Sequence, residues 1–246
     1  MRIKILIGIV FIQAIIICQY EYRTAYLRNC INKHTTVHKK NREQSSFTGG
    51  SDKEHPNYWV ERSWENCLRK KNIKCEIAFY GNSIIYNSDF TSYFPDKDII
   101  NLGVPGENIE GLIRRIKLLE CTQPKKIFIM IGINNIGEPT KDIGEKYDSL
   151  LCRIKETLPH AKLYVHSILP INHTAYKKYS TNNKIKECNF TIAKLAKRHH
   201  ITYIDLYSLY IQGEELPMSL THDDGIHLKP QAYDRWAENI RQYIYE

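Results

Sequence analysis

An apolar run that ends abruptly in a polar turn constrains the fold of this 246-residue chain more than any other feature. Apolar and aromatic residues from Ile77 to Tyr80 close on Gly81, which predicts a buried strand and then a tight turn that carries Ser83. Ligands of open α/β sheets bind just beyond the carboxyl ends of the strands, where this turn places Ser83. A serine becomes a nucleophile only when a base accepts its proton and donors stabilise the resulting oxyanion. A nucleophilic Ser83 therefore requires a base, an acid that orients this base, and oxyanion donors from elsewhere in the chain.

Strands and helices alternate through the rest of residues 55–246. We expect a first helix from His55 onward, where aromatic residues recur at helical spacing. Further strands are predicted at 99–103, 126–132, 162–168 and 201–206, and helices at 109–120, 143–158, 182–199 and 230–243. Strands that alternate with helices of this length form parallel βαβ units. The pattern predicts an α/β protein built as a three-layer α/β/α sandwich.

The N-terminal region differs from this pattern. Arg2 and Lys4 precede a strongly apolar stretch, which is typical of an export signal or an uncleaved membrane anchor. The following residues are polar and charged and predict a spacer without a core of its own. The sequence thus predicts a signal peptide or N-terminal membrane anchor at 1–20, a polar spacer at 21–54 and a globular domain at 55–246. We expect the domain to be exported, either periplasmic or membrane-anchored, with membrane association through residues 5–20.

Charge and cysteine spacing argue against two classes of function. The formal net charge of +8 suits an anionic partner, but the basic residues are scattered and form no long tract with interleaved aromatics. We therefore expect no nucleic-acid partner. The seven cysteines include no Cys-x-x-Cys pair and no zinc spacing, and their odd number argues against a complete disulfide framework. Mostly buried or free thiols are expected, and a local Cys67–Cys75 disulfide is left open.

Polar residues that a core does not need collect after two further strands and in one C-terminal loop. Gly106 and Asn134 follow predicted strands and would supply oxyanion donors together with the backbone N–H of Ser83. Each also has a structural explanation, Gly106 as a turn residue and Asn134 as a loop cap. Asp224 and His227 are three residues apart, so one turn brings the carboxylate against the imidazole. An Asp that holds Nδ1–H leaves Nε2 to accept the serine proton, as in a Ser-His-Asp triad.

A metal site is the alternative for the C-terminal loop. His222, Asp223, Asp224 and His227 all carry groups that bind metals. This alternative has no evident further ligands and leaves Ser83 unexplained. We therefore expect neither a metal nor an organic cofactor.

Four blocks follow one another along the chain: Gly81-Asn82-Ser83, Asn101-x-Gly103-x-x-Gly106, Gly132-x-Asn134-Asn135 and Asp224-Gly225-x-His227. In this order they resemble the SGNH hydrolases, also called the GDSL esterase/lipase superfamily. The resemblance covers residues 56–246 and implies a flavodoxin-like sandwich with a five-stranded parallel sheet. By match to the blocks, Ser83 would be the nucleophile, His227 the base and Asp224 its orienting acid. Gly106 and Asn134 would complete the oxyanion hole with the Ser83 amide.

The pattern looks most like the single-domain bacterial acylhydrolases that act on acetyl esters of carbohydrates. It implies a serine esterase for short-chain esters, with a small-molecule or glycan ester as its partner. A lysophospholipase, lipase or thioesterase of the same superfamily is an alternative, and so is a catalytically silent, membrane-tethered binding domain. Asn82 and Asn135 depart from the commonest pattern, since Asp is frequent at both places. Neither position transfers a proton in the family scheme, so we expect activity to survive.

Overall fold

Five parallel strands form the central sheet in a computed structural model of the chain, which describes residues 72–176 and 181–246. The strands are β1 (Ile77–Gly81), β2 (Ile99–Gly103), β3 (Lys126–Met130), β4 (Lys162–His166) and β5 (Thr202–Ile204). Their order across the sheet is β2-β1-β3-β4-β5, and every neighbouring pair is parallel. The predicted five-stranded parallel sheet is confirmed.

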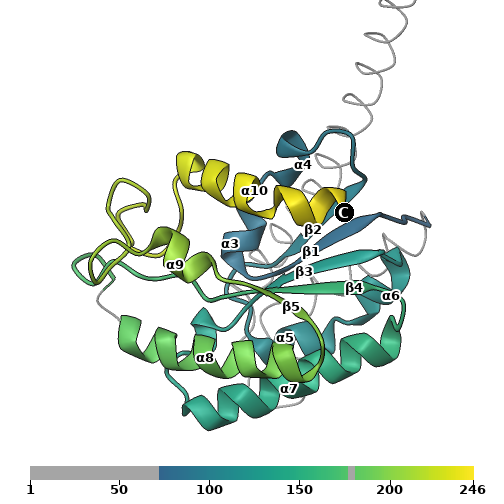
Figure 1. Cartoon of the computed structure of the whole chain (residues 1–246), viewed down its shortest axis with the longest axis horizontal. Coiled ribbons are helices and arrows are strands. Elements are labelled where there is room, and N and C mark those ends of the chain that lie inside the picture. The colour runs from purple at the N-terminus through teal and green to yellow at the C-terminus, as the bar shows by residue number, and fades with distance from the viewer. Residues whose placement is uncertain (1–71, 177–180) are drawn as a thin grey trace, which may run out of the picture. The chain divides into compact units, whose positions relative to one another are not determined.

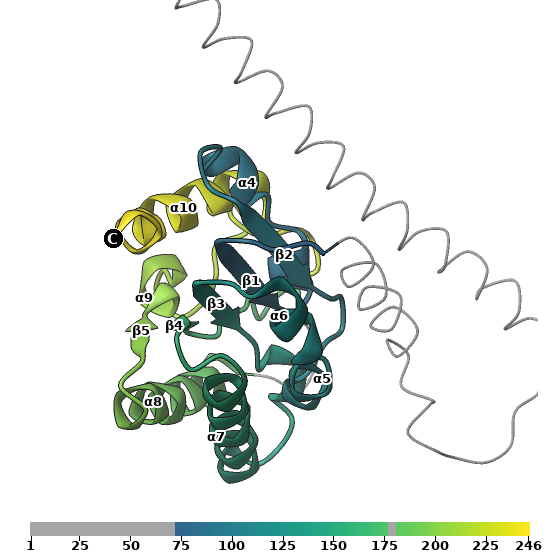
Figure 2. The same ribbon diagram turned by 90° about the vertical axis from the view of Figure 1, so that its right-hand side faces the viewer.

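Helices cover both faces of this sheet (Figure 1). They are α3 (Ser83–Tyr86), α4 (Phe90–Tyr93), α5 (Ile109–Arg114), α6 (Lys117–Thr122), α7 (Thr140–Thr157), α8 (Asn182–Arg198), α9 (Leu206–Tyr210) and α10 (Pro230–Tyr245). Seen from the side in Figure 2, α4, α9 and α10 lie on one face and α5, α7 and α8 on the other. This arrangement is the predicted α/β/α sandwich.

Alternate residues of the strands supply the two halves of the core. On the face toward α10, the ring of Phe128 stacks on Phe79 at 5.0 Å and on Tyr164 at 4.4 Å, and Trp236 of α10 belongs to the same buried cluster. On the opposite face, the buried Tyr80 hydroxyl donates to the carbonyl of Leu112 in α5 at 2.6 Å. Strands buried on both faces explain why their sequences are apolar without alternation.

The carboxyl ends of β1 and β3 form the switch point of the sheet. The chain passes from β1 to β2 on one side, and β3 then pairs with β1 on the other side. Crevices at such switch points are the usual ligand sites of open α/β sheets. Ser83 follows β1 directly and Asn134 follows β3, so both lie at this edge.

Several predicted elements are shorter than the sequence pattern indicates or are divided, and the strand expected at 162–168 ends at His166. The helix expected at 109–120 is split into α5 and α6, because Arg115 leaves the helical conformation and its buried guanidinium binds groups outside the helix. The strand expected at 201–206 ends at Ile204, because the Asp205 side chain accepts a hydrogen bond from the Ser208 amide and begins α9. The strand expected at 126–132 ends at Met130, before a 3-10 turn over Ile133–Asn135.

Some of the predictions fall on residues outside the described part of the chain. They are the segments 1–20 and 21–54, the helix expected after His55 and the cysteine Cys67. Cys152 and Cys188, which are described, carry free thiols as expected. Among the helices within residues 72–176 and 181–246, none has the length and hydropathy needed to cross a membrane.

Candidate active site

Ser83 begins helix α3, and its neighbours fix the backbone there. Asn82 is the N-cap of α3: its side-chain Oδ1 accepts a hydrogen bond from the Ile84 amide at 3.0 Å, and the residue is 1% exposed. Gly81 leaves no room for a side chain, since a Cβ there would clash with the carbonyl oxygen of Met130. The strand therefore turns sharply into the helix, and Ser83 itself stays partly exposed.

The loop between α9 and α10 brings His227 and Asp224 to Ser83. Nε2 of His227 lies 2.8 Å from Oγ of Ser83, and Nδ1 lies 2.5 Å from Oδ2 of Asp224. The other oxygen of Asp224 accepts hydrogen bonds from the backbone amides of Ile226 and His227, both at 3.0 Å. The structure thus brings together Ser83, His227 and Asp224, which the sequence pattern predicted as a Ser-His-Asp triad. Ser83 and the other two residues lie near opposite ends of the domain sequence.

The surroundings of Asp224 favour its ionised form. Partial burial alone would raise the pKa of this carboxyl group. The hydrogen bonds from the His227 ring and from the two backbone amides outweigh burial and hold the pKa below its usual range. An ionised Asp224 can accept a hydrogen bond from an Nδ1–H of His227, an arrangement that turns Nε2 toward Oγ of Ser83.

The two other oxyanion-hole candidates lie on adjacent loops that are tied together. Gly106 has a φ of 75° in an exposed turn, and Asn134 lies in the 3-10 turn after β3. Nδ2 of Asn134 donates to the backbone carbonyl of Glu107, the residue after Gly106, at 2.7 Å. A primary amide carries two N–H groups, so one can hold the loop while the other donates elsewhere. The amide of Val104 donates to the Gly81 carbonyl at 3.1 Å, which ties the same loop to the strand end before Ser83.

Asn135 sits at the centre of a polar network that no local sequence signal indicates. Its Oδ1 accepts from the Ile109 amide at 3.0 Å, and its Nδ2 donates to Glu110 at 3.0 Å and to Glu138 at 2.8 Å. Lys146 of α7 forms ion pairs with both of these glutamates. Asn135 itself is 1% exposed, whereas the side chains of the two glutamates are partly exposed. The amide group thus links the oxyanion candidate Asn134 to α5 and α7.

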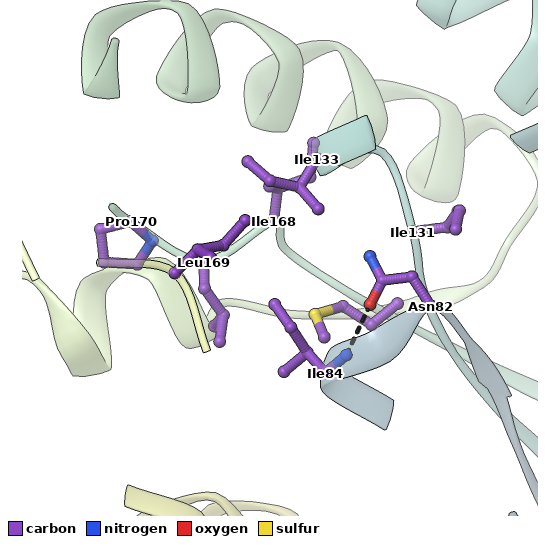
Figure 3. Close-up of a pocket in the computed structure, with 9 residues that line it drawn as sticks. Asn82, Ile84, Ile131, Ile133, Ile168, Leu169 and Pro170 are labelled. Atoms are coloured by element: carbon purple, nitrogen blue, oxygen red, sulfur yellow. Dashed lines mark hydrogen bonds between the residues drawn. The ribbon is translucent and has the colours of Figure 1, made fainter. Parts of the chain in front are cut away.

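An apolar pocket lies at the strand ends, and Asn82 and Ile84 form part of its wall (Figure 3). It is lined by Asn82, Ile84, Met130, Ile131, Ile133, Ile168, Leu169, Pro170 and Ile226. Asn82 and Ile84 flank Ser83 in the chain, and Ile226 precedes His227. No sequence pattern predicts this pocket, because its wall comes from the ends of three strands and from the C-terminal loop.

The metal-site alternative gains no support at the C-terminal loop. Within residues 72–176 and 181–246, the side chains close enough together to hold a metal ion are Asp148, Cys152 and His199, on α7 and at the end of α8. His222 and Asp223 are exposed and do not belong to such a group. Oδ1 of Asp148 already lies 2.5 Å from the His199 ring and pairs with Arg198.

Comparisons with known proteins identify relatives of the whole described domain. The model of the GDSL-like Lipase/Acylhydrolase family matches residues 80–235. A relative from Drosophila melanogaster, named platelet-activating factor acetylhydrolase IB subunit beta homolog, is 23% identical over 197 residues, which cover 76% of this chain and 85% of that protein. The structure of a GDSL-like lipase from Bacteroides thetaiotaomicron superposes with a TM-score of 0.64 at 22% identity, covering 76% of this chain and 97% of the other. An acetyl xylan esterase superposes with a TM-score of 0.59 at 17% identity, covering 68% and 98%. The fold is therefore shared with these hydrolases.

Proposed function

The chain belongs to the GDSL-like lipase/acylhydrolase family, whose members are ester hydrolases, and we propose that it is a serine esterase for short acyl esters. The observation that carries this proposal is the position of the His227 ring, whose Nε2 lies 2.8 Å from Oγ of Ser83 and whose Nδ1 lies 2.5 Å from Oδ2 of Asp224. A triad of this kind supports acyl transfer when hydrogen-bond donors beside the serine stabilise the oxyanion of the tetrahedral intermediate. The loops of Gly106 and Asn134, at the same edge of the sheet, supply the donors in this proposal.

The proposed reaction proceeds through an acyl-enzyme. Nε2 of His227 accepts the proton of Ser83 while Oγ attacks the ester carbonyl, and the oxyanion accepts hydrogen bonds from the Ser83 amide, the Gly106 amide and the Asn134 side chain. His227 then protonates the leaving alcohol as the bond to the acyl carbon breaks. Water, deprotonated by His227, attacks the acyl-enzyme, and His227 returns this proton to Oγ of Ser83 as the bond to the acyl carbon breaks and the carboxylic acid leaves.

The apolar pocket supports a short acyl group as the substrate. The pocket is narrow, and its wall is made of isoleucine, leucine, proline and methionine side chains that are mostly buried. An acetyl methyl group is small and apolar and matches such a wall. The names of two relatives, an acetylhydrolase and an acetyl xylan esterase, agree with acetyl esters.

Two classes of molecule are candidates for the alcohol part of the ester substrate. We favour a carbohydrate ester, which was the expectation from the sequence and agrees with the name of the acetyl xylan esterase neighbour. The second candidate is an acetyl ester of a phospholipid, favoured by the name of the Drosophila relative. Initial rates on acetylated xylan and on platelet-activating factor, at equal acetyl concentration, distinguish the two.

The activity itself is tested on the full chain with p-nitrophenyl acetate. We expect turnover in the parent and a loss of at least a thousandfold in Ser83→Ala and in His227→Ala, with Ser83→Ala also abolishing labelling by a fluorophosphonate. Tyr245→Phe, at the far end of α10, serves as the control and should keep parental turnover. A folded parent that neither hydrolyses the ester nor reacts with the fluorophosphonate would contradict the proposal and favour a silent binding domain.

The chain-length preference is tested by widening the pocket. Ile168→Ala removes pocket wall while the Ile168 backbone stays held by the Asn189 side chain, which binds its amide at 2.8 Å and its carbonyl at 2.9 Å. We expect the butyrate-to-acetate ratio of kcat/KM to rise about tenfold or more, since one methylene in an apolar pocket is worth about 1–3 kcal/mol. Ile192→Ala, which truncates a buried side chain of α8 outside the pocket, should leave the ratio unchanged.

Export is proposed from the first 20 residues alone. The positive residues before the apolar stretch support either a cleaved signal or a retained anchor. N-terminal sequencing of the protein recovered from cell fractions separates these cases: a shortened chain means cleavage, and an intact chain in the membrane fraction means anchoring. An intact chain found only in the cytosol would contradict the proposal.

A further inference from the structure

Beneath the candidate oxyanion hole lies an ion pair that is almost completely shielded from water. Glu107 is 0% exposed and Arg115 is 2% exposed, and Nε of Arg115 donates to Oε2 of Glu107 at 2.9 Å. Charged side chains are rarely buried this deeply, because removing two charges from water costs more than most pairs return. We refer to these two residues as the Glu107–Arg115 pair.

The arginine end of the pair holds the carboxyl ends of two strands. Nη2 of Arg115 donates to the carbonyl of Gly81, two residues before Ser83, at 2.8 Å, and Nη1 donates to the carbonyl of Leu102 at 2.6 Å. The guanidinium also lies over the ring of Tyr80, 4.6 Å from its centroid. Arg115 therefore joins β1 to β2 at the point where both chains leave the sheet for the site.

The glutamate end of the pair holds the two loops that carry the other donors. Glu107 follows Gly106 directly, and its backbone carbonyl accepts the hydrogen bond from Asn134 at 2.7 Å. Its carboxylate also accepts from the Asn108 amide at 3.2 Å, so the first residues of α5 are tied to the same group. The carboxylate lies so close to α5 that a Cβ on Gly111 would overlap it.

Each proposed oxyanion donor is therefore connected to the pair. The Ser83 amide lies two residues after Gly81, whose carbonyl Arg115 binds, and Gly106 directly precedes Glu107. The Asn134 side chain is hydrogen-bonded to the Glu107 carbonyl. We infer that the Glu107–Arg115 pair positions all three donors: the Ser83 amide through Gly81, the Gly106 amide through Glu107, and the Asn134 side chain through the Glu107 carbonyl. The pair touches no reacting atom, so it acts as a positioning pair and not as a catalytic one. This inference rests on the proposed function.

A double replacement separates positioning from folding. Glu107→Leu with Arg115→Met replaces the ion pair by apolar side chains, a change that buried pairs often tolerate without loss of stability, whereas Glu107→Gln alone leaves the arginine charge unpaired. We expect the double variant to fold, to lose tenfold to a hundredfold in kcat on p-nitrophenyl acetate, and to keep KM within threefold. Its affinity for a trifluoromethyl ketone, which forms an oxyanion adduct on Ser83, should fall by the same factor as kcat.

Two controls make the result decisive. Ile154→Ala removes a fully buried side chain from α7 and lowers stability, but it should leave kcat and the ketone affinity near the parent values. Arg115→Lys keeps the charge, but its single ammonium nitrogen cannot reproduce the planar spread of three guanidinium nitrogens toward two carbonyls and a carboxylate, so its kcat should lie between those of the parent and the double variant. A folded double variant with parental kcat and ketone affinity would overturn the inference.

The failure of the proposed function would look different. A parent that fails to hydrolyse p-nitrophenyl acetate but reacts with a fluorophosphonate retains the site, and the rate of that reaction then replaces kcat in the same comparison. A parent that does neither would contradict the proposed esterase, and the positioning role would fall with it. A normal parent together with a normal double variant would contradict the positioning role alone.

Discussion

Replacing Asn135 by Asp tests whether the polar network beside the oxyanion candidates depends on an amide. In the structure, the Asn135 amide donates to two carboxylates, those of Glu110 and Glu138, and the residue is 1% exposed. An ionised Asp at this position would lose both donated hydrogen bonds and face two like charges at about the same distance. Asp is also the residue that the family resemblance led us to expect here, so the substitution asks why this chain differs.

The size of the effect depends on which state of the new carboxyl group, ionised or protonated, costs the folded variant less free energy. Two hydrogen bonds to charged groups are worth about 1.5–3 kcal/mol each, so the variant with an ionised carboxylate would lose roughly 3–6 kcal/mol before repulsion is counted. The folded protein can instead bind a proton at this carboxyl group, which at pH 7 costs about 4 kcal/mol for a group with an ordinary pKa near 3.9. A protonated carboxyl group has a single O–H donor, so one of the two donated hydrogen bonds is lost in that state as well. We therefore expect Asn135→Asp to lower the free energy of unfolding by about 3–6 kcal/mol at pH 7.

The sign of the pH dependence is fixed by the same reasoning. The two glutamates raise the pKa of the new carboxyl group in the folded state above its unfolded value, so the destabilisation is small below about pH 4 and grows as the pH rises. Urea unfolding of the parent and of Asn135→Asp at about pH 4.5 and pH 7 measures the change. A difference between the two proteins that is below about 1 kcal/mol at pH 7, or that does not vary with pH, would refute the reasoning.

The matched control removes the two charges. Glu110→Gln with Glu138→Gln, combined with Asn135→Asp, lets the new carboxylate accept hydrogen bonds from two amides, and most of the lost stability at pH 7 should return. The same two glutamine substitutions in the parent background give the reference. Because Asn134 precedes this residue, kcat of Asn135→Asp should fall together with its stability and recover in the triple variant.

Three further predictions rest on other contacts. Asp224→Asn leaves His227 without its ionised partner, and kcat on p-nitrophenyl acetate should fall about a hundredfold or more. Burial lowers the pKa of His166 to about 3, so between pH 6.5 and pH 3 the unfolded chain binds a proton at this residue and the folded chain does not. The parent should therefore lose a few kcal/mol of unfolding free energy as the pH falls through this range. In urea titrations, His166→Phe should lose less stability than the parent over the same range. Gly103→Ala would drive a Cβ into the backbone nitrogen of Tyr86, and the melting temperature should fall sharply.

The sequence predicted the sheet well, and the four blocks can be recognised in it, because both kinds of signal are local. An apolar run, a glycine and a polar residue within a few positions define a strand end such as that of Ser83, whatever the rest of the chain does. The short helices α3, α4 and α9 were missed, because four or five residues do not complete enough turns to show a period. The pairing of Asp224 with His227 was predicted from spacing alone.

The Glu107–Arg115 pair shows where sequence reasoning reaches its limit. Glutamate and arginine eight residues apart, at the two ends of a helix, predict solvent-exposed charges on general grounds. Their burial depends on Gly111, which leaves space for the carboxylate, and on carbonyls supplied by β1 and β2. These groups are remote in sequence, so their convergence is visible only in the folded chain.

The two departures from the family pattern have different physical meanings, and a second substitution exposes the difference. Asn82 acts only as an acceptor in its helix cap, through Oδ1 to the Ile84 amide, and a carboxylate would accept the same hydrogen bond at the favourable N-terminal end of α3. Asn135 acts as a donor to two acids, which a carboxylate cannot do. We therefore expect Asn82→Asp to change the free energy of unfolding by less than about 1 kcal/mol, several times less than Asn135→Asp. Equal losses in the two variants would mean that the buried position of each residue, and not its hydrogen-bonding role, decides which side chain is tolerated.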